Sequence, residues 1–332
     1  MEEFTMDTRS RSEHVSHSQL HNYFLTPTNY TFSDFRDSFG IEIARDVYNS
    51  LYQLGIGKNH YRQLIPILHR CDNNTTKYIF QLYDNRQIET VVIKRKTGKT
   101  ICLSTQVGCP IKCKFCKSGE KGFIRNLTAS EIVQQYLFVS EDINRIVFMG
   151  IGEPLLNYEE LIKSIHILRD RNGLYFPTDG ISLSTVGPTQ KLLLLKEEHI
   201  KIQLVLSLHA TDQKTRDYLI PGMSKYNINE VITSVMEYGR RHNRKISIAY
   251  LLLPGINDRN ADLEKLIQWF SNKNVVINLL KYNGIKYNEF RPASNMEFKK
   301  IKKRLEANNV QVTIRQSLGT SIEAACGQLV IK

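Results

Sequence analysis

The most informative residues in this sequence are its cysteines. Three of them, Cys109, Cys113 and Cys116, are spaced by three and then two residues in the segment GCPIKCKFC. Cys102 lies just before this segment, and Cys326 stands near the carboxyl terminus. Clustering of this kind in a large chain that begins without a secretory signal indicates metal or redox chemistry, not a disulfide framework.

The three clustered cysteines can converge on one metal centre only from a loop. Structural zinc sites use a complete set of four ligands, and no fourth ligand is apparent nearby. Three thiolates on a four-iron cluster leave one iron open, where a small molecule can bind. The spacing resembles the signature of the radical S-adenosylmethionine (SAM) superfamily, as does the aromatic Phe115, and this resemblance implies a [4Fe–4S] cluster that binds SAM. A zinc site is the alternative.

A second motif, FMGIGEPLLN, ends the next strand-like run of the chain. Gly150 and Gly152 allow the backbone to approach a ligand closely. Glu153 follows at the carboxyl end of the run, where α/β folds bind their ligands. The motif is similar to the GGE-type motif of the same superfamily, whose carboxylate and backbone bind the amino group of SAM. Its position one strand after the cysteine loop favours that function over an ordinary loop.

These motifs lie in a chain that alternates between strand-like and helix-like segments from residue 100 onward. Apolar runs typical of strands cover 100–106, 145–150, 180–185, 202–209, 246–253 and 275–282, and 310–316 adds an edge strand. Helical periodicity covers 128–140, 158–169, 227–242, 261–271 and 295–307, and Thr128 with Glu131 forms a capping box. The alternation predicts a parallel sheet. Periodicity alone does not distinguish a doubly wound sheet from an open (β/α) barrel.

The residues before this alternating region have weaker patterns. Residues 1–75 contain helical stretches such as 35–54, and we interpret them as a small accessory domain that could bind RNA. Residues 76–99 are predicted to form a hairpin linker, with strands YIFQLY and ETVVIKRK joined by a turn at 84–86. Residues 100–332 then form the core domain. Cys71 has no motif around it, and we assign it a structural role.

Composition limits the class of protein further. The chain has 332 residues, 41% of them hydrophobic, and no run approaches the ~20 apolar residues of a membrane helix. The polar beginning MEEFTMDTRSRSEHVSHSQ does not resemble a secretory signal, so we expect a cytoplasmic protein without a membrane partner. The net charge of +12 modestly favours a polyanionic partner over an indifferent basic surface.

Three basic runs could contact such a partner. They are Lys94, Arg95 and Lys96 with Lys99, the stretch 112–125, and the stretch 299–304. The first two flank or form the cysteine loop, and we expect them to follow the RNA backbone. The third lies on a predicted helix and is equally consistent with a solvated face.

Motifs specific to one family extend over about three quarters of the chain, from about residue 86 to residue 329. They are IETVVIK, CLSTQVGCPIKCKFC, GFIRNLTASEIVQQ, FMGIGEPLLN, LSTVG, LSLHA, LLLPGIND, INLLKYN and EAACGQL. In these motifs the chain resembles the RlmN/Cfr family of radical SAM RNA methyltransferases. The resemblance implies an α/β fold, a partial (β/α)6 radical SAM barrel with a small N-terminal accessory domain. It also implies RNA as a partner, and an electron donor such as flavodoxin or ferredoxin.

Cys326, in AACGQL, and Cys102 match the two further cysteines of this family. The resemblance implies that Cys326 accepts a methyl group from one SAM molecule. A second SAM, cleaved at the cluster, provides a 5′-deoxyadenosyl radical that takes a hydrogen from this methyl group, and the resulting carbon radical adds to the base. Cys102 then attacks the sulfur of Cys326 and releases the product through a transient disulfide. This route is needed because an adenine carbon is too weakly nucleophilic to attack the sulfonium methyl directly.

Residue-by-residue matching to the family completes the expected site. Glu89 corresponds to the proton acceptor that removes the hydrogen from the methylated carbon, and Cys102 is the alternative for that role. The implied SAM contacts are Gly152, Glu153, Ser184, Ser207, Leu208, His209 and Asn283, and the implied cluster ligands are Cys109, Cys113 and Cys116. The SAM contacts recur at the carboxyl ends of successive predicted strands, which favours one shared site.

The implied reaction is methylation of carbon 2 or carbon 8 of an adenine in structured RNA. The first candidate substrate is 23S ribosomal RNA, and the second is transfer RNA. Two other functions fit parts of the sequence. One is a radical SAM enzyme that acts on a protein or a small molecule, and the other is a non-enzymatic, zinc-stabilised RNA-binding module.

Overall fold

The computed structural model describes residues 26–53, 64–139, 142–285 and 290–330. It divides into two compact units. The first comprises Met1–Gln63, Thr128–Val139 and Glu159–Phe176, and the second comprises Leu64–Leu127, Ser140–Tyr158 and Pro177–Lys332. The polar beginning of the chain, and Leu54 at the end of the expected helical stretch 35–54, lie outside the described residues. Within the described ranges, no helix combines the length and apolar character that a membrane crossing requires.

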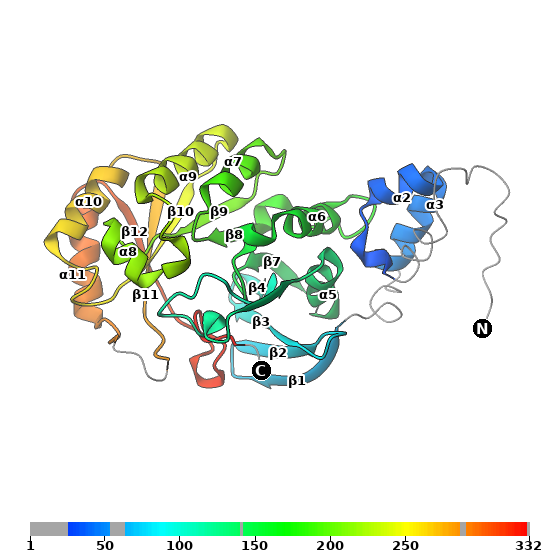
Figure 1. Cartoon of the computed structure of the whole chain (residues 1–332), viewed down its shortest axis with the longest axis horizontal. Coiled ribbons are helices and arrows are strands. Elements are labelled where there is room, and N and C mark those ends of the chain that lie inside the picture. The colour runs from blue at the N-terminus through cyan, green and yellow to red at the C-terminus, as the bar shows by residue number, and fades with distance from the viewer. Residues whose placement is uncertain (1–25, 54–63, 140–141, 286–289, 331–332) are drawn as a thin grey trace. The chain divides into compact units, whose positions relative to one another are not determined.

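The large unit contains a ten-stranded sheet (Figure 1). Its strands are β1 (Ile65–Cys71), β2 (Thr75–Gln81), β3 (Gln87–Arg95), β4 (Gly98–Cys102), β7 (Ile143–Phe148), β8 (Ile181–Thr185), β9 (Gln203–Ser207), β10 (Ile246–Leu251), β11 (Val275–Leu280) and β12 (Gln311–Arg315). They pair in chain order, antiparallel from β1 to β4 and parallel from β4 to β12. A doubly wound sheet reverses its strand order at a switch point, and this order never reverses. The predicted partial barrel is confirmed, and β12 is the predicted edge strand.

Helices α7 (Thr189–Glu197), α9 (Ile228–His242), α10 (Asn260–Phe270) and α11 (Asn295–Glu306) lie around the outside of the parallel strands (Figure 1). The core between the layers is made of the apolar side chains on the face of the strands that does not line the cavity, among them Ile146, Leu183, Leu206, Ile248 and Ile277, each at most 1% exposed. The sequence patterns predicted α9, α10 and α11, but not α7 or the short α8 (Gln213–Leu219). Four consecutive leucines in α7 obscure the helical period, and α8 has only seven residues.

The predicted hairpin is present, because β2 and β3 pair antiparallel and Leu82 N donates to Arg86 O at 2.8 Å across the turn. Strand β3 also pairs with β4, and β1 pairs with β2, so one sheet runs across both expected domain boundaries. Strand pairing joins 65–99 to the large unit, so the boundary between the units does not fall at residue 75. The accessory role of the N-terminal residues stays a prediction.

The small unit is helical. Its helices are α2 (Phe32–Phe39), α3 (Ile41–Tyr48), α5 (Ala129–Val139) and most of α6 (Tyr158–Arg169). The buried ring of Tyr48 packs edge-on against two other rings. Its centroid lies 5.4 Å from that of Phe32 and 4.9 Å from that of Tyr52. The predicted capping box starts α5: Glu131 N donates to Thr128 Oγ1 at 3.2 Å, and Thr128 N donates to Glu131 Oε2 at 2.9 Å.

Candidate active site

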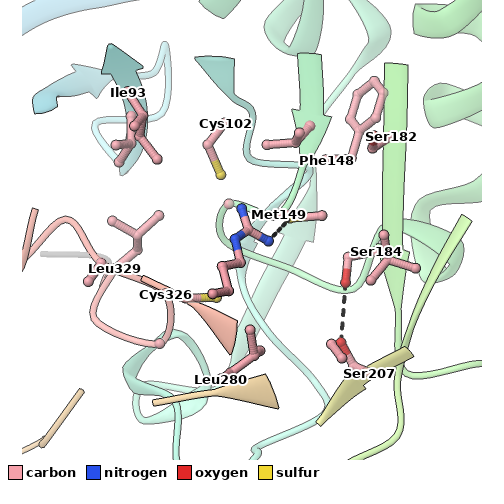
Figure 2. Close-up of a pocket in the computed structure, with 18 of the residues that line it drawn as sticks. Ile93, Cys102, Phe148, Met149, Ser182, Ser184, Ser207, Leu280, Cys326 and Leu329 are labelled. Carbon is pink, nitrogen blue, oxygen red and sulfur yellow. Dashed lines mark hydrogen bonds between the residues drawn. The ribbon is translucent and has the colours of Figure 1, made fainter. Parts of the chain in front are cut away.

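A cavity of about 550 Å³ opens at the carboxyl ends of the parallel strands in the large unit (Figure 2). Because parallel strands end at the same edge of a sheet, polar residues that follow different strands meet there. Most of the expected site residues line this cavity. They are Cys102, Cys109, Cys113, Cys116, Gly152, Glu153, Ser184, Ser207, His209, Asn283 and Cys326. Glu89 and Leu208 do not.

The three cysteines of the motif lie in the loop between β5 (Gln106–Gly108) and β6 (Phe123–Asn126), which form a separate two-stranded sheet. Cys109 N donates to Gly122 O at 3.0 Å, and Cys116 N donates to Cys113 O at 3.1 Å, which closes a turn within the loop. Burial raises the pKa of Cys109 to about 12 and raises those of Cys113 and Cys116 above their usual range. These thiols therefore stay protonated until a metal centre offsets their charge.

The donor set fits an iron–sulfur cluster. The three cysteines line one cavity, and thiolates are the soft ligands that iron–sulfur clusters take. No three His, Cys, Asp or Glu side chains among the described residues are grouped around a single metal-ion position. A four-iron cluster differs from a zinc ion in this respect, since each cysteine binds a separate iron.

Helix α8 supports the cysteine loop from outside the cavity. Lys114 N donates to Leu219 O at 3.0 Å, and Gly222 N donates to Ile111 O at 2.9 Å. A Cβ atom on Gly222 would lie 2.6 Å from Ile111 Cα, so only glycine permits this approach. The loop geometry therefore depends on a close backbone contact.

Arg216 on α8 is a buried cation beside this loop. Its side chain is fully buried, and its Nη2 donates to Val186 O at 2.6 Å. Its Nε and Nη1 have no hydrogen-bond partner among the described residues. Its charge lowers the pKa of Cys113, against the larger effect of burial. Sequence reasoning missed Arg216, because nothing in QKTRDYL distinguishes it from a solvent-exposed arginine.

Glu153 is held in place by three hydrogen bonds. Oε1 accepts from Thr185 Oγ1 at 2.6 Å and from Leu155 N at 3.1 Å, and Oε2 accepts from Val186 N at 2.9 Å. A carboxylate has about four acceptor positions, so one remains for a ligand in the cavity. Burial raises the pKa of Glu153 to about 7, although these hydrogen bonds oppose the shift. Gly152 precedes it at φ +111°, a conformation that favours glycine.

Other polar groups of the cavity lie in or just after β8, β9 and β11. Ser184 Oγ and Ser207 Oγ are 3.2 Å apart (Figure 2). His209 Nδ1 accepts from Leu251 N at 3.0 Å, and burial lowers the pKa of His209 to about 3. The ring is therefore neutral with its proton on Nε2. Asn283 Nδ2 donates to Cys326 O at 3.1 Å.

The two outer cysteines enter the cavity from different elements. Cys102 ends β4 and is buried, whereas Cys326 lies in the segment after residue 322 and is exposed; both are free thiols (Figure 2). Burial first, and then the proximity of Cys326, raise the pKa of Cys102 to about 12, while the charge of Arg315 lowers it. Arg315, which sequence reasoning also missed, lines the cavity at the end of β12.

The two expected residues outside the cavity lie in the sheet or directly after a strand. The Glu89 side chain on β3 is 1% exposed, and its Oε1 lies 3.1 Å from Lys77 Nζ. Its Oε2 accepts from Val330 N at 3.1 Å. The Leu208 side chain is fully buried, and its backbone N donates to Ala249 O at 3.1 Å.

The basic runs differ in whether their side chains line the cavity or form ion pairs. Lys94, Arg95 and Lys96 are exposed in the β3–β4 hairpin, and Arg95 and Lys99 line the cavity. On α11, in contrast, Arg304 pairs with Glu264 and Lys302 pairs with Glu306.

Known proteins match both the chain and its fold. The profile of the radical SAM superfamily matches residues 103–270. A probable RNA methyltransferase of Rhodopseudomonas palustris (strain BisB5) is 46% identical over 253 residues, which cover 76% of this chain and 70% of that protein. A probable dual-specificity RNA methyltransferase RlmN of Thermotoga maritima is 42% identical over 266 residues, or 78% of this chain and 77% of that protein. The crystal structure of a radical SAM methyltransferase from Sphaerobacter thermophilus aligns with a TM-score of 0.85 at 28% identity, covering 92% of this chain and 99% of that one.

The fold and the cysteine-lined cavity thus define a radical SAM enzyme, a class that uses a [4Fe–4S] cluster and SAM. Its relatives narrow the class: the chain belongs to the RlmN/Cfr family and is a methyltransferase. The predicted family, fold class, enzyme class and cofactors are confirmed, and the non-enzymatic zinc module is excluded.

Proposed function

We propose that this enzyme transfers a methyl group from SAM, by way of Cys326, to carbon 2 or carbon 8 of an adenine in structured RNA. One observation carries the proposal: Cys102 and Cys326 line the same cavity as the three cysteines of the radical SAM motif. A radical enzyme that acts on a protein or a small molecule has no general need for two additional thiols there. The names of the relatives support RNA as the substrate class, with ribosomal RNA as first candidate and transfer RNA as second.

In this proposal Cys109, Cys113 and Cys116 would hold the cluster. Glu153, with Gly152, would hold the amino group of SAM, and the cavity-lining Ser184, Ser207, His209 and Asn283 would contact the rest of the molecule. When bound, the cluster supplies the electron that cleaves SAM and starts the radical chemistry. The hydrogen bonds that fix Glu153 orient its carboxylate before SAM arrives, which lowers the ordering cost of binding.

The two outer cysteines have environments that suit different steps. Cys326 is exposed, so its sulfur can receive the methyl group and then meet an RNA base. Cys102 is buried with a raised pKa, so it remains a neutral thiol while the methyl group is carried. After the base is bound to Cys326 through the former methyl carbon, Cys102 loses its proton and its sulfur attacks that of Cys326. The sulfur–sulfur bond forms as the bond from the Cys326 sulfur to this carbon breaks, and the carbon keeps the electron pair and takes up a proton, so the methylated base is released.

Positive charge beside the cavity supports an RNA partner. Arg95 and Lys99 line the cavity from the β3–β4 hairpin, which lies at the amino end of β4, and Lys94 and Lys96 are exposed in the same hairpin. We further propose a cytoplasmic location, since free thiols persist in a reducing compartment, and a flavodoxin- or ferredoxin-type electron donor.

A trapping experiment tests the function. In Cys102→Ala the carrier remains but the resolving thiol is gone, so the bridge from Cys326 to RNA should form and persist. Protein purified from cells should then carry RNA that resists denaturant and is removed by nuclease, and mass spectrometry of the digested adduct identifies the nucleotide. Cys326→Ala and the double variant should carry none. Free Cys102→Ala protein with ordinary activity would contradict the proposal.

A further inference from the structure

A buried ion pair lies beside the segment that carries Cys326. Lys77 on β2 and Glu89 on β3 occupy adjacent strands, and their side chains are 3% and 1% exposed. Their charged atoms are 3.1 Å apart, and neither residue lines the cavity. Charges this deeply buried persist only when they are paired and their remaining hydrogen-bonding capacity is used.

Lys77 and Glu89 each make a further hydrogen bond, and these two bonds hold the two ends of the segment 323–330. Lys77 Nζ donates to Glu323 O at 3.1 Å, and Val330 N donates to Glu89 Oε2 at 3.1 Å. Cys326 lies between these two anchor points. Hydrogen bonds that involve a charged group are stronger than neutral ones, so each end of the segment is held by a strong contact.

The backbone of Glu89 is bonded to the segment that follows the other cysteine. Ser104, two residues after Cys102, donates from Oγ to the backbone O of Glu89 at 2.6 Å, and Ile151 N donates to Ser104 Oγ at 2.9 Å. At Glu89, β3 is therefore bonded through its backbone to the segment after Cys102 and through its side chain to the segment that carries Cys326.

We propose that Lys77 and Glu89 act together as a buried clamp that positions Cys326, and that Glu89 is not the proton acceptor of the reaction. The clamp rests on the proposed function of Cys326 as methyl carrier. Both residues are positioning residues, since neither reaches the cavity. A base must reach the methylated carbon, whereas a clamp needs only to hold the segment 323–330.

The two roles of Glu89 predict different results for Glu89→Gln and Lys77→Met. If Glu89 were the proton acceptor, Glu89→Gln would stall at the adduct and accumulate covalent RNA, while Lys77→Met would not. A clamp predicts that both variants lower kcat at least tenfold, leave KM for RNA within about twofold and accumulate no covalent RNA. The double variant Lys77→Met/Glu89→Leu should lose no more than either single variant, because the two residues act as one unit.

Amide hydrogen exchange provides a readout that does not depend on activity. In metal-free protein, Lys77→Met should speed exchange at Val330 N at least tenfold, although Lys77 does not contact that amide. Lys196→Met, which breaks the ion pair with Glu237 elsewhere, should leave Val330 unchanged. If a single variant does not fold, the double variant, which leaves no unpaired charge, takes its place in both measurements.

Each outcome separates the clamp from the proposed function. Covalent RNA on Glu89→Gln alone, or unchanged Val330 exchange in both Lys77→Met and the double variant, would overturn the clamp. Trapped RNA on Cys102→Ala would still support the carrier role in either case. If Cys102→Ala traps nothing while Val330 exchange rises as expected, the clamp holds the segment and the carrier function is the part that fails.

Discussion

At the scale of single residues, the cavity places titratable groups where burial changes their protonation. Glu153 and His209 both line the cavity, and burial moves their pKa values in opposite directions, to about 7 and about 3. Both shifts favour the neutral form, because a buried charge is poorly solvated. At neutral pH His209 is therefore an uncharged hydrogen-bonding group, whereas Glu153 titrates.

This difference predicts how the stability of the metal-free protein depends on pH. The pKa of Glu153 is raised from 4.5 to about 7, so the folded chain holds a proton that the unfolded chain loses between these values. The folded state keeps its full stability, as far as Glu153 is concerned, below pH 4.5, where the carboxyl is protonated. This stability is lost as pH rises through 7. Glu153→Gln, which does not titrate, should be less stable than the wild type at pH 5. Because the wild type loses stability as pH rises, the difference in free energy of unfolding between the two proteins should move in favour of Glu153→Gln by up to about 3 kcal/mol at pH 8. Urea unfolding of both proteins at several pH values measures this, and a constant difference would contradict it.

At the scale of elements, the cysteine loop takes its shape from neighbours that are distant in sequence. The β5–β6 pair closes its ends, α8 and the turn after it contact its middle, and the carboxyl-terminal segment contacts its last part. Lys117 N donates to Gly327 O, and Ser118 Oγ donates to Leu329 O, each at 2.8 Å. The loop that would hold the cluster and the segment that carries Cys326 are therefore fixed to each other.

Gly222→Ala tests this support from α8. The added Cβ would lie 2.6 Å from Ile111 Cα and 2.8 Å from Ile111 O, and backbone atoms cannot move aside as a flexible side chain can. The loop should shift, and iron bound per chain after anaerobic reconstitution should fall at least twofold while the far-ultraviolet circular dichroism is retained. Gly284→Ala is the matched control, because its Cβ meets no atom within 4 Å. Equal iron contents in the two variants would show that the contact does not shape the loop.

At the scale of the whole molecule, the net charge of +12 is distributed over sites of different kinds. The basic residues of α11 include Lys302 and Arg304, which form local ion pairs with acidic neighbours. The hairpin run is exposed, and its Arg95 lines the cavity from the amino end of the parallel strands. We expect the RNA backbone to follow this positive charge.

Charge reversal of Lys94, Arg95 and Lys96 to Glu tests this path. Binding of structured RNA should weaken, and the slope of log affinity against log salt should become shallower by roughly 2 to 3, because fewer counterions are released. Reversal of the exposed Lys299, Lys300 and Lys303 changes the net charge equally and should leave the slope nearly unchanged. Fluorescence anisotropy titrations over a range of salt concentrations supply both slopes. Equal slopes for the two triple variants would place the RNA elsewhere.

The sequence by itself determined the features that depend on neighbouring residues. Strand and helix periods are local, so the parallel strands and α9, α10 and α11 were predictable within a few residues. The spacing of Cys109, Cys113 and Cys116 is also local, and the family motifs predicted most of the residues that line the cavity.

Only the tertiary structure decided what depends on residues far apart in the chain. The strand order, the extension of the sheet to β1 and the burial of Arg216 all come from such long-range packing. Glu89 is the clearest case: in the sequence it is one carboxylate in a hairpin, while its partner Val330 lies 241 residues away. Whether a carboxylate is a base in a cavity or a buried clamp depends on which groups the fold brings to it, and a local pattern contains no information about those groups.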